Sequence, residues 1–136
     1  MTEEDLKEIR RINAQLKRHR ELLEYLTQKA ETIPAIQPKE RVQTSPVNSG
    51  NEAADSAIDV EMEIRKEEKL LREMQEEARS AFAGEKMSFD ERRILNLRYL
   101  RCMTWDEIGE EVGYSVRQAI RIHGRVVDRM FKGKMS

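Results

Sequence analysis

The side chains in this sequence best suited to recognition chemistry are arginines and a glutamine near the C-terminus. Arg117, Gln118 and Arg121 fall on one side of a predicted helix. The other side of that helix carries apolar residues, namely Ala119, Ile122, Val126 and Met130. The major groove of DNA admits one helix, and Arg and Gln form paired hydrogen bonds with guanine and adenine edges. We therefore predict that Arg117, Gln118 and Arg121 read bases in duplex DNA.

A second set of polar residues around this helix suits the DNA backbone. Phosphates are bound by cationic side chains, by hydroxyls and by the amide N–H groups that open helices. From Ser115 to the end, six Lys or Arg residues face a single acid, Asp128. The alternative is an ordinary solvated charged surface. We predict phosphate contacts by Thr104, Trp105, Ser115, Arg125, Arg129, Lys132 and Lys134, with a core position as the second interpretation of Trp105.

Three capping boxes predict where the helices of the C-terminal part begin. In this pattern a Ser or Thr side chain accepts a hydrogen bond from the third amide along, and a Glu or Gln side chain bonds back. It occurs as Ser88–Glu91, Thr104–Glu107 and Ser115–Gln118. Each box opens an amphipathic run. The sequence therefore predicts helices at 89–101, 105–112 and 116–131.

The last two predicted helices are separated only by Gly113, Tyr114 and Ser115. A glycine there adopts the positive φ that ends one helix, and Ser115 starts the next. We predict a helix-turn-helix from about Thr104 to Phe131.

The packing of this helix-turn-helix can also be predicted. Gly109 is small where the two helices approach. Val116 and Ile120 are apolar near the reading face, and we expect them to pack on the hairpin or on a second subunit rather than touch thymine methyls. The expected core is Ile108, Val112, Tyr114, Ala119 and Ile122, completed by Leu95, Leu97, Tyr99 and Leu100.

The first 85 residues contain two segments of similar length with heptad periodicity. One row in the first segment is Ile9, Leu16, Leu23 and Ala30, and the second segment has Ala57, Ile64, Leu71 and Ala78. Matched apolar stripes predict a helical hairpin, with coiled-coil dimerisation between chains as the alternative. His19 and Glu67 interrupt the companion rows and are expected to mark an edge or a register. The three prolines and the run Ser45–Asn51 predict a linker at about 34–51.

Composition limits the class of protein. The 136 residues are 38% hydrophobic and 38% charged, which suits long solvated helices with narrow apolar stripes. From Lys86 onward there are 11 basic and 7 acidic residues, so this part is basic although the whole chain has a net charge of −1. Cys102 is the only cysteine and only two histidines accompany it, so we expect neither a disulfide nor a zinc site. The sequence contains no apolar run long enough to cross a membrane, so we predict no membrane span.

The segment 94–115 resembles region 4 of bacterial sigma-70-type factors. The resemblance lies in Ile94-Leu95-Asn96-Leu97-Arg98-Tyr99-Leu100 and in the run from Met103 to Ser115. In those factors this helix-turn-helix reads the −35 promoter element, and its flanks contact RNA polymerase. The first 85 residues do not resemble the other sigma regions, so a complete sigma factor is not expected.

The whole chain is more similar to small phage and prophage transcriptional regulators of the ArpU/RinA-like kind. Those proteins have two charged helices around a linker that resembles Arg41–Pro46, followed by a motif like Tyr114–Arg125. The resemblance implies a late-gene or packaging-region regulator in the cytoplasm of a bacterial host, associated with the nucleoid. Val116 and Ile120 replace residues that are often charged in the sigma pattern, which argues against a −35-like specificity.

The sequence therefore predicts an all-α fold, with a long coiled-coil-like two-helix hairpin at 1–85 and a three-helix DNA-binding domain at 86–136. The expected function is a sequence-specific transcriptional regulator that binds double-stranded DNA, with a second copy of the chain or RNA polymerase as further candidate partners. The alternatives are a DNA-recognition subunit for phage packaging, like a small terminase, and a module that binds polymerase or a sigma factor. No phosphate loop, nucleophile–base set or metal cluster is present, so we predict no enzymatic activity, no cofactor and no metal.

Overall fold

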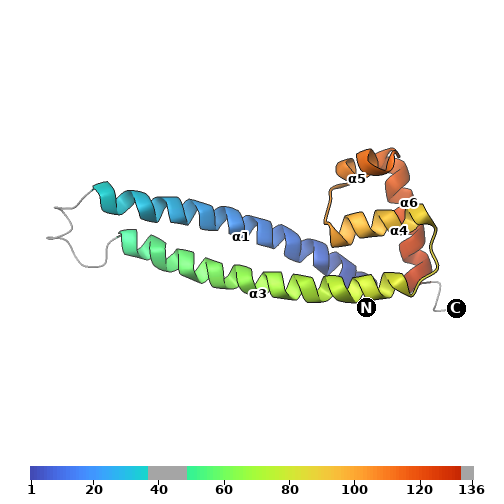
Figure 1. Ribbon diagram of the computed structural model, residues 1–136, viewed down its shortest axis with the longest axis horizontal. Coiled ribbons are helices and arrows are strands. Elements are labelled where there is room, and N and C mark those ends of the chain that lie inside the picture. Colours follow the sequence, from blue (N-terminus) through green and yellow to red (C-terminus); the bar gives the residue numbers. More distant parts are fainter. Residues whose placement is uncertain (37–48, 133–136) are drawn as a thin grey trace. The chain divides into compact units, whose positions relative to one another are not determined.

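The structure is a computed structural model that describes residues 1–36 and 49–132. The helical elements are α1 (Glu3–Ile36), α3 (Ser49–Ala83), α4 (Phe89–Leu95), the π-helical segment η1 (Asn96–Leu100), α5 (Trp105–Val112) and α6 (Val116–Phe131) (Figure 1). No strand occurs in the ranges described, and the predicted all-α fold class is confirmed. No helix within these ranges is long and apolar enough to cross a membrane.

The chain divides into two compact units. We call residues 14–70 the helix-pair unit, and residues 1–13 with 71–136 the core unit. The core unit therefore contains α4, η1, α5 and α6 together with the first turns of α1 and the last turns of α3. This division differs from the predicted boundary at residue 85, because both long helices contribute to both units.

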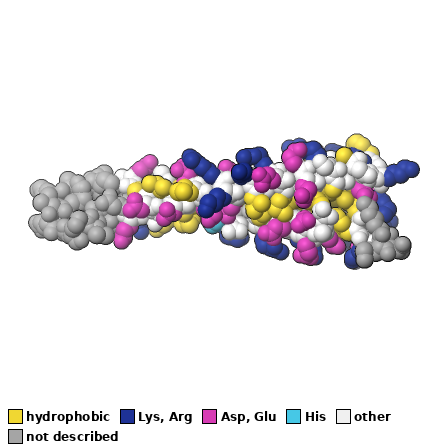
Figure 2. All heavy atoms as spheres, turned by 90° about the horizontal axis from the view of Figure 1, so that it is seen from below, with side chains coloured by type: hydrophobic (Ala, Val, Ile, Leu, Met, Phe, Trp, Pro, Cys, Tyr) yellow, Lys and Arg dark blue, Asp and Glu magenta, His cyan; other side chains and the backbone are white. Residues whose placement is uncertain are grey.

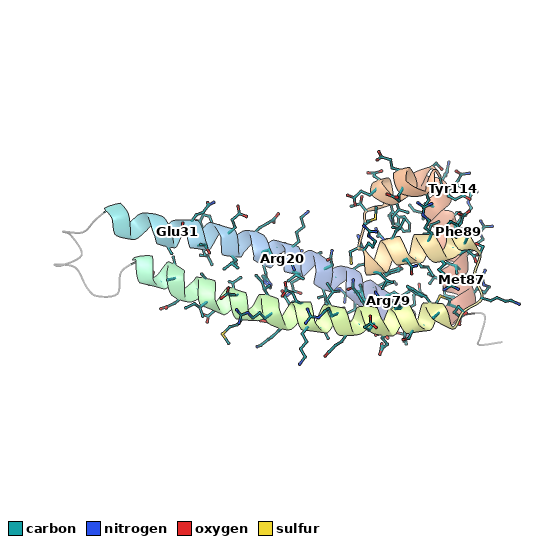
Figure 3. The ribbon with its side chains drawn as sticks, in the orientation of Figure 1. Arg20, Glu31, Arg79, Met87, Phe89 and Tyr114 are labelled. Carbon is teal, nitrogen blue, oxygen red and sulfur yellow. The ribbon has the colours of Figure 1, made fainter. Side chains whose placement is uncertain are left out.

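In the helix-pair unit, α1 and α3 run antiparallel (Figure 1). His19 and Glu67, which interrupt the two heptad stripes, meet each other: His19 Nδ1 is 2.8 Å from Glu67 Oε1. Glu67 is only 9% exposed and is the one buried charged residue among those described. Beside this pair, Arg20 extends from α1 toward α3 (Figure 3), where its Nη2 donates to Glu68 Oε2 at 2.7 Å. The two interruptions thus match each other across the helix pair, as a register marker requires.

The helices continue into both ends of the predicted linker. α1 reaches Ile36 and includes Pro34, and α3 begins at Ser49 rather than after residue 51. Each residue added to a nucleated helix gains a backbone hydrogen bond, which favours extension at Ser49–Asn51; Pro34 has no amide N–H to donate and lies two residues before the end of α1. The predicted loop is therefore wrong for 34–36 and 49–51, and residues 37–48 of it lie outside the described ranges.

The core of the core unit forms where α4, η1, α5 and α6 meet. Ile94, Leu97, Ile108 and Ala119 make a buried cluster, and Met103, Trp105, Val112 and Ile122 pack against it. Leu95 and Tyr99 are also buried, as are Leu6 and Ile9 of α1 and Ala78 and Phe82 of α3. Of the predicted core, Leu100, Val112, Tyr114 and Ile122 are half-buried rather than buried, and the prediction missed Ile94.

The helix predicted at 89–101 is not α-helical throughout. At Asn96 it widens into η1, where the amide N–H of Arg101 donates to the Asn96 carbonyl at 3.1 Å, five residues back. The segment ends at Cys102, whose φ of 52° lies in the left-handed region, and the Met103 amide donates to the Leu97 carbonyl at 2.9 Å. The wider turn changes which side chains face the core after Asn96, where Leu97 and Tyr99 are buried and Leu100 is half-buried.

Side chains from distant parts of the core unit satisfy the carbonyl groups at the end of η1. Gln75 Nε2 of α3 donates to the carbonyls of Tyr99 at 2.9 Å and Leu100 at 3.3 Å. Arg10 Nη1 of α1 donates to the Arg98 carbonyl of η1 at 3.5 Å, and also to the Met103 carbonyl after the segment at 3.3 Å. The last carbonyls of a helix have no intrahelical partner and need such donors. This explains why parts of α1 and α3 belong to the core unit.

Candidate nucleic-acid interface

The turn between α5 and α6 is built as the capping pattern predicts. Thr104 and Ser115 cap the two helices, and in both boxes the reciprocal bonds to Glu107 and Gln118 are present. Gly113 has a φ of 80° and its amide donates to the Gly109 carbonyl at 2.9 Å. The Ser88 box at the start of α4 is present as well. The three predicted helix starts and their capping contacts are therefore confirmed.

Gly109 is where α5 passes closest to the turn. A Cβ added there would lie 2.9 Å from the Tyr114 carbonyl oxygen and 3.6 Å from a methyl of Val116. Tyr114, at the turn between α5 and α6 (Figure 3), also donates from its hydroxyl to Asp90 Oδ2 of α4 at 2.6 Å, which raises the pKa of Tyr114. The turn is therefore held by a close backbone approach on one side and by α4 on the other.

One face of α6 is fixed in the core and the opposite face is free. Ala119, Val126, Val127 and Met130 are buried. The exposed residues are Arg117, Gln118, Ile120, Arg121, Gly124, Arg125, Asp128, Arg129 and Lys132. Val116 is half-buried against Gly109, whereas Ile120 stays 43% exposed. Val116 therefore packs within the core unit, and the expected packing of Ile120 on a second subunit stays a prediction.

Three arginines of the exposed face differ from Arg92 and Arg93 of the same unit. Arg92 donates to the carbonyls of Phe82 and Glu85, and Arg93 contacts Glu111. By contrast, neither a hydrogen bond nor an ion pair involves Arg117, Arg121 or Arg125 within 1–36 and 49–132. Their guanidinium groups are free to bind another molecule.

Gln118 has a structural task that competes with base reading. Its Oε1 accepts hydrogen bonds from the Ser115 amide and the Ser115 hydroxyl, both at 3.2 Å. A paired contact to adenine uses both the oxygen and the nitrogen of the glutamine amide. Gln118 must release the cap to make that contact, whereas Arg117 and Arg121 are free already.

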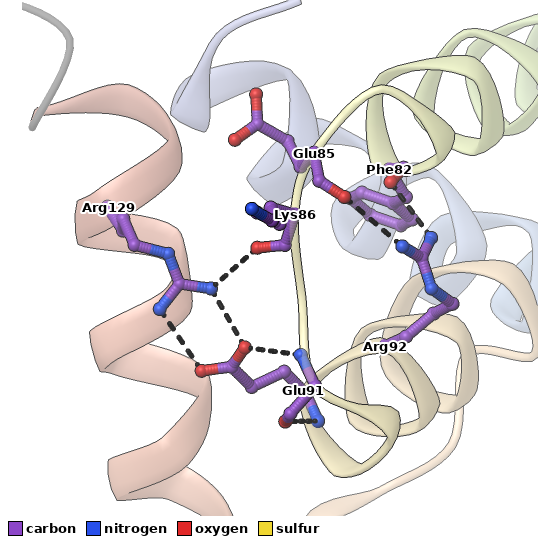
Figure 4. Close-up of polar contacts among 7 residues, drawn as sticks. Phe82, Glu85, Lys86, Glu91, Arg92 and Arg129 are labelled. Carbon is purple, nitrogen blue, oxygen red and sulfur yellow. Dashed lines mark hydrogen bonds and ion pairs between the residues drawn. The ribbon is translucent and has the colours of Figure 1, made fainter.

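Arg129 is engaged within the protein rather than free for phosphate. Its Nη2 and Nη1 donate to the two carboxylate oxygens of Glu91 at 2.8 and 3.1 Å, and Nη2 also donates to the Lys86 carbonyl at 3.2 Å (Figure 4). The Arg129 guanidinium lowers the pKa of Glu91, and the carboxylate raises the pKa of Arg129. Glu91 also belongs to the Ser88 capping box, so Arg129 ties the end of α6 to the start of α4.

The remaining predicted phosphate contacts are divided among several environments. Thr104 and Ser115 are exposed at the starts of α5 and α6, where amide N–H groups face outward. Lys132 lies 3.4 Å from Asp128 in an exposed ion pair, and Lys134 lies outside the described residues. Trp105 packs against the core cluster, with the Arg98 guanidinium 4.3 Å from its ring centroid. Of its two interpretations, the core position is the one that these contacts support.

His123 is an internal residue that the sequence analysis did not single out. Its Nε2 is hydrogen-bonded to the Tyr99 hydroxyl at 2.6 Å, and Trp105 meets its ring edge-on at a centroid distance of 5.1 Å. Burial, aided by the charge of Arg98, lowers the pKa of His123 to about 4. The imidazole is therefore neutral at physiological pH and supports the inner side of α6.

Gly124 was also missed as a site residue. It lies in the middle of α6 on the face of Arg117 and Arg121, and nothing described lies within 4 Å of a Cβ built there. Glycine inside a helix costs about 1 kcal/mol relative to alanine. The packing of the described residues does not require this glycine, so the structure supplies no internal reason for it.

Comparisons with known proteins return no match: neither a protein-family model, nor a curated protein, nor a solved structure is significantly similar to the chain. Within the described ranges, no group of three or more His, Cys, Asp or Glu residues is placed to hold a metal ion.

Proposed function

We propose that the protein is a sequence-specific transcriptional regulator that binds double-stranded DNA by placing α6 in the major groove. The observation that carries this proposal is the row of Arg117, Arg121 and Arg125. These residues are spaced by one helical turn each, are exposed, and have no acidic partner within the described ranges. The buried face of the same helix fixes the direction in which they point.

In the proposed complex, the position of a residue along α6 decides whether it contacts bases or the DNA backbone. Arg117 and Arg121, near the start of the helix, donate pairs of hydrogen bonds to guanine edges. Arg125 binds a backbone phosphate, together with the hydroxyls and amides at Thr104 and Ser115. Because Gln118 caps the helix, it contributes one donor from its amide nitrogen rather than a paired contact. Arg129 is left out of the interface, since its ion pair with Glu91 holds the fold.

Gly124 gives independent support to the same surface. Glycine is favoured where another backbone must approach closely. Its position among the free arginines of α6 suits the approach of a DNA strand. The resemblance of 94–115 to sigma region 4 supports a role in transcription, and the likeness to phage regulators supports control of phage or prophage late genes.

Selection from a random duplex library tests the proposal. We expect one enriched sequence, bound with an affinity that falls steeply with salt, at a log–log slope of about −4 to −6 for about four to seven phosphate contacts. Arg121→Ala should weaken binding to that sequence by about 1–3 kcal/mol and relax the preference at the contacted base pair.

Arg18→Ala is the matched control, because Arg18 is equally an exposed arginine but lies on α1 in the helix-pair unit. It removes the same charge and should leave both affinity and sequence preference unchanged. If Arg121→Ala and Arg18→Ala weaken DNA binding equally, the binding is general charge attraction and not recognition by α6. Failure to enrich any sequence would reject sequence-specific recognition and favour the packaging or polymerase-binding alternatives.

A further inference from the structure

α3 carries a second heptad stripe that faces away from α1. Ala57, Val60, Ile64, Glu67 and Leu71 lie on the side of α3 that packs in its own chain. A different row, Asp55, Ile58, Met62, Arg65 and Lys69, has the same alternating spacing of three and four residues and is exposed throughout. At its centre, Ile58 and Met62 are 56% and 55% exposed. We call this row the outer stripe. Spacing of this kind is typical of a helix that packs on another helix.

Charge along this side of α3 is separated around the apolar centre. The acids Glu52, Asp55 and Asp59 precede Met62, and the bases Arg65, Lys66 and Lys69 follow it. Figure 2 shows the lower face of the molecule, where hydrophobic side chains lie exposed on the helix pair with acidic and basic side chains around them. A helix with opposite charges at the two ends of an apolar patch complements a copy of itself when that copy runs in the opposite direction.

We infer that the outer stripe binds a second copy of this chain, with the two α3 helices antiparallel about a two-fold axis near residue 60. In that register Ile58 of each chain packs on Met62 of the other, and Asp55 of each faces Arg65 of the other. Glu52 and Lys66 form a further complementary pair at the edge. All of these contacts occur twice, as a two-fold interface requires.

The parallel arrangement is disfavoured by the same residues. It would place Asp55 against Asp55 and Arg65 against Arg65, and like charges across an interface are repulsive. In the antiparallel register only Asp59 and Glu61 approach their own copies, beside the axis and at the exposed edge. The apolar centre is small, so we expect a weak dimer whose stability falls as salt screens the ion pairs.

Self-association through α3 does not require that α6 binds DNA, so the two proposals fail separately. If both hold, a two-fold dimer presents two copies of α6, and the selected DNA sequences should contain inverted repeats.

Charge reversal tests the antiparallel register. Sedimentation of the full chain over a range of concentrations at low salt should show a monomer–dimer equilibrium. Asp55→Arg alone and Arg65→Asp alone should each weaken dimerisation about tenfold or more, because each places two like-charge contacts in the interface. The double variant exchanges the charges and should recover the wild-type equilibrium to within about threefold.

Two apolar substitutions complete the test. Ile58→Glu should abolish the dimer. Tyr25→Glu is the matched control, since Tyr25 is 57% exposed in the same unit but lies on α1, and it should leave the dimer intact. Circular dichroism should show the same helix content in all variants as in the wild type, because the changed side chains are exposed. A wild-type chain that stays monomeric, or a double variant no better than the single ones, would overturn the inference.

Discussion

The two histidines of this protein show how differently its two units hold a polar group. In the helix-pair unit His19 lies between two helices, a quarter of its side chain exposed, and is hydrogen-bonded to the carboxylate of Glu67. In the core unit His123 is enclosed by Tyr99 and Trp105, with no carboxylate beside it. Both rings make a hydrogen bond, but only His19 has a carboxylate as its partner.

The difference follows from the width of the two interiors. Two packed helices bury only a narrow stripe, so a polar pair at its edge stays close to water and serves to fix the register. Three short helices packed on parts of α1 and α3 enclose side chains from all sides, and a charge there loses its hydration. The core unit should therefore respond more strongly than the helix-pair unit to lost packing and to added protons.

The largest effect is expected from a cavity in the wider core. Ile108→Ala removes methyl groups from a fully buried site and should lower the free energy of unfolding by about 3 kcal/mol. Leu26→Ala, at a half-buried position of the helix pair, should cost about 1 kcal/mol. Urea unfolding followed by helical circular dichroism measures both variants, and the fluorescence of Trp105, the only tryptophan, follows the core unit separately. Equal costs at the two sites would contradict the comparison.

Acid should destabilise the core unit by an amount close to that of the cavity. The folded pKa of His123, about 4, lies below the 6.5 of a free histidine, so the unfolded chain binds the extra proton between these values. The contribution of His123 is fully present above pH 6.5 and is lost as the pH falls. The loss reaches about 3 kcal/mol by pH 4, at 1.36 kcal/mol per pKa unit.

Glutamine at His123 tests the acid response. Stability measured by urea at pH 7.5 and pH 4.5 should fall less in His123→Gln than in the wild type, because the variant has no proton to gain there. A loss that is unchanged in His123→Gln would show that carboxylates, and not His123, govern the acid response.

A smaller effect separates two glycines of the α5–α6 region. Gly109→Ala should destabilise the core unit by about 1–2 kcal/mol, because the new Cβ would meet the Tyr114 carbonyl at 2.9 Å. Gly124→Ala should stabilise it by up to about 1 kcal/mol, since the site is open and alanine favours helix. Thermal unfolding should show a lower melting temperature for Gly109→Ala and a higher one for Gly124→Ala than for the wild type. Gly124→Ala should also weaken DNA binding, and unchanged affinity would remove Gly124 from the proposed interface.

Much of the C-terminal part could be predicted from local signals. The caps at Ser88, Thr104 and Ser115 use contacts within four residues, so the sequence pattern contains the whole interaction. The left-handed Gly113 and the crowded Gly109 follow from the short turn for the same reason. The free arginines of α6 were also predictable, because a steady helical period places them opposite Ala119 and Val126.

The missed features depend on partners far away in the sequence. The carbonyl groups of the π-helical segment Asn96–Leu100 accept hydrogen bonds from Gln75 and Arg10. No local sequence pattern predicts either contact. Arg129 was assigned to phosphate because its own helix is basic, whereas its acceptor, Glu91, lies 38 residues earlier. The contact between His19 and Glu67 could not be predicted either, because the two residues are 48 positions apart, although both were identified as interruptions of the heptad rows.

The division of the core unit between two chain segments has a consequence for synthesis on the ribosome. Residues 1–13 are translated before the helix-pair unit, and residues 71–136 after it. Leu6 and Ile9 of α1, both buried in the finished protein, must therefore stay without their partners while some sixty codons are read. Pairing of α1 with α3 shortens the effective loop that must close between the segments. We therefore expect the helix pair to form before the core unit closes and to hold the first segment near the last helices as they emerge.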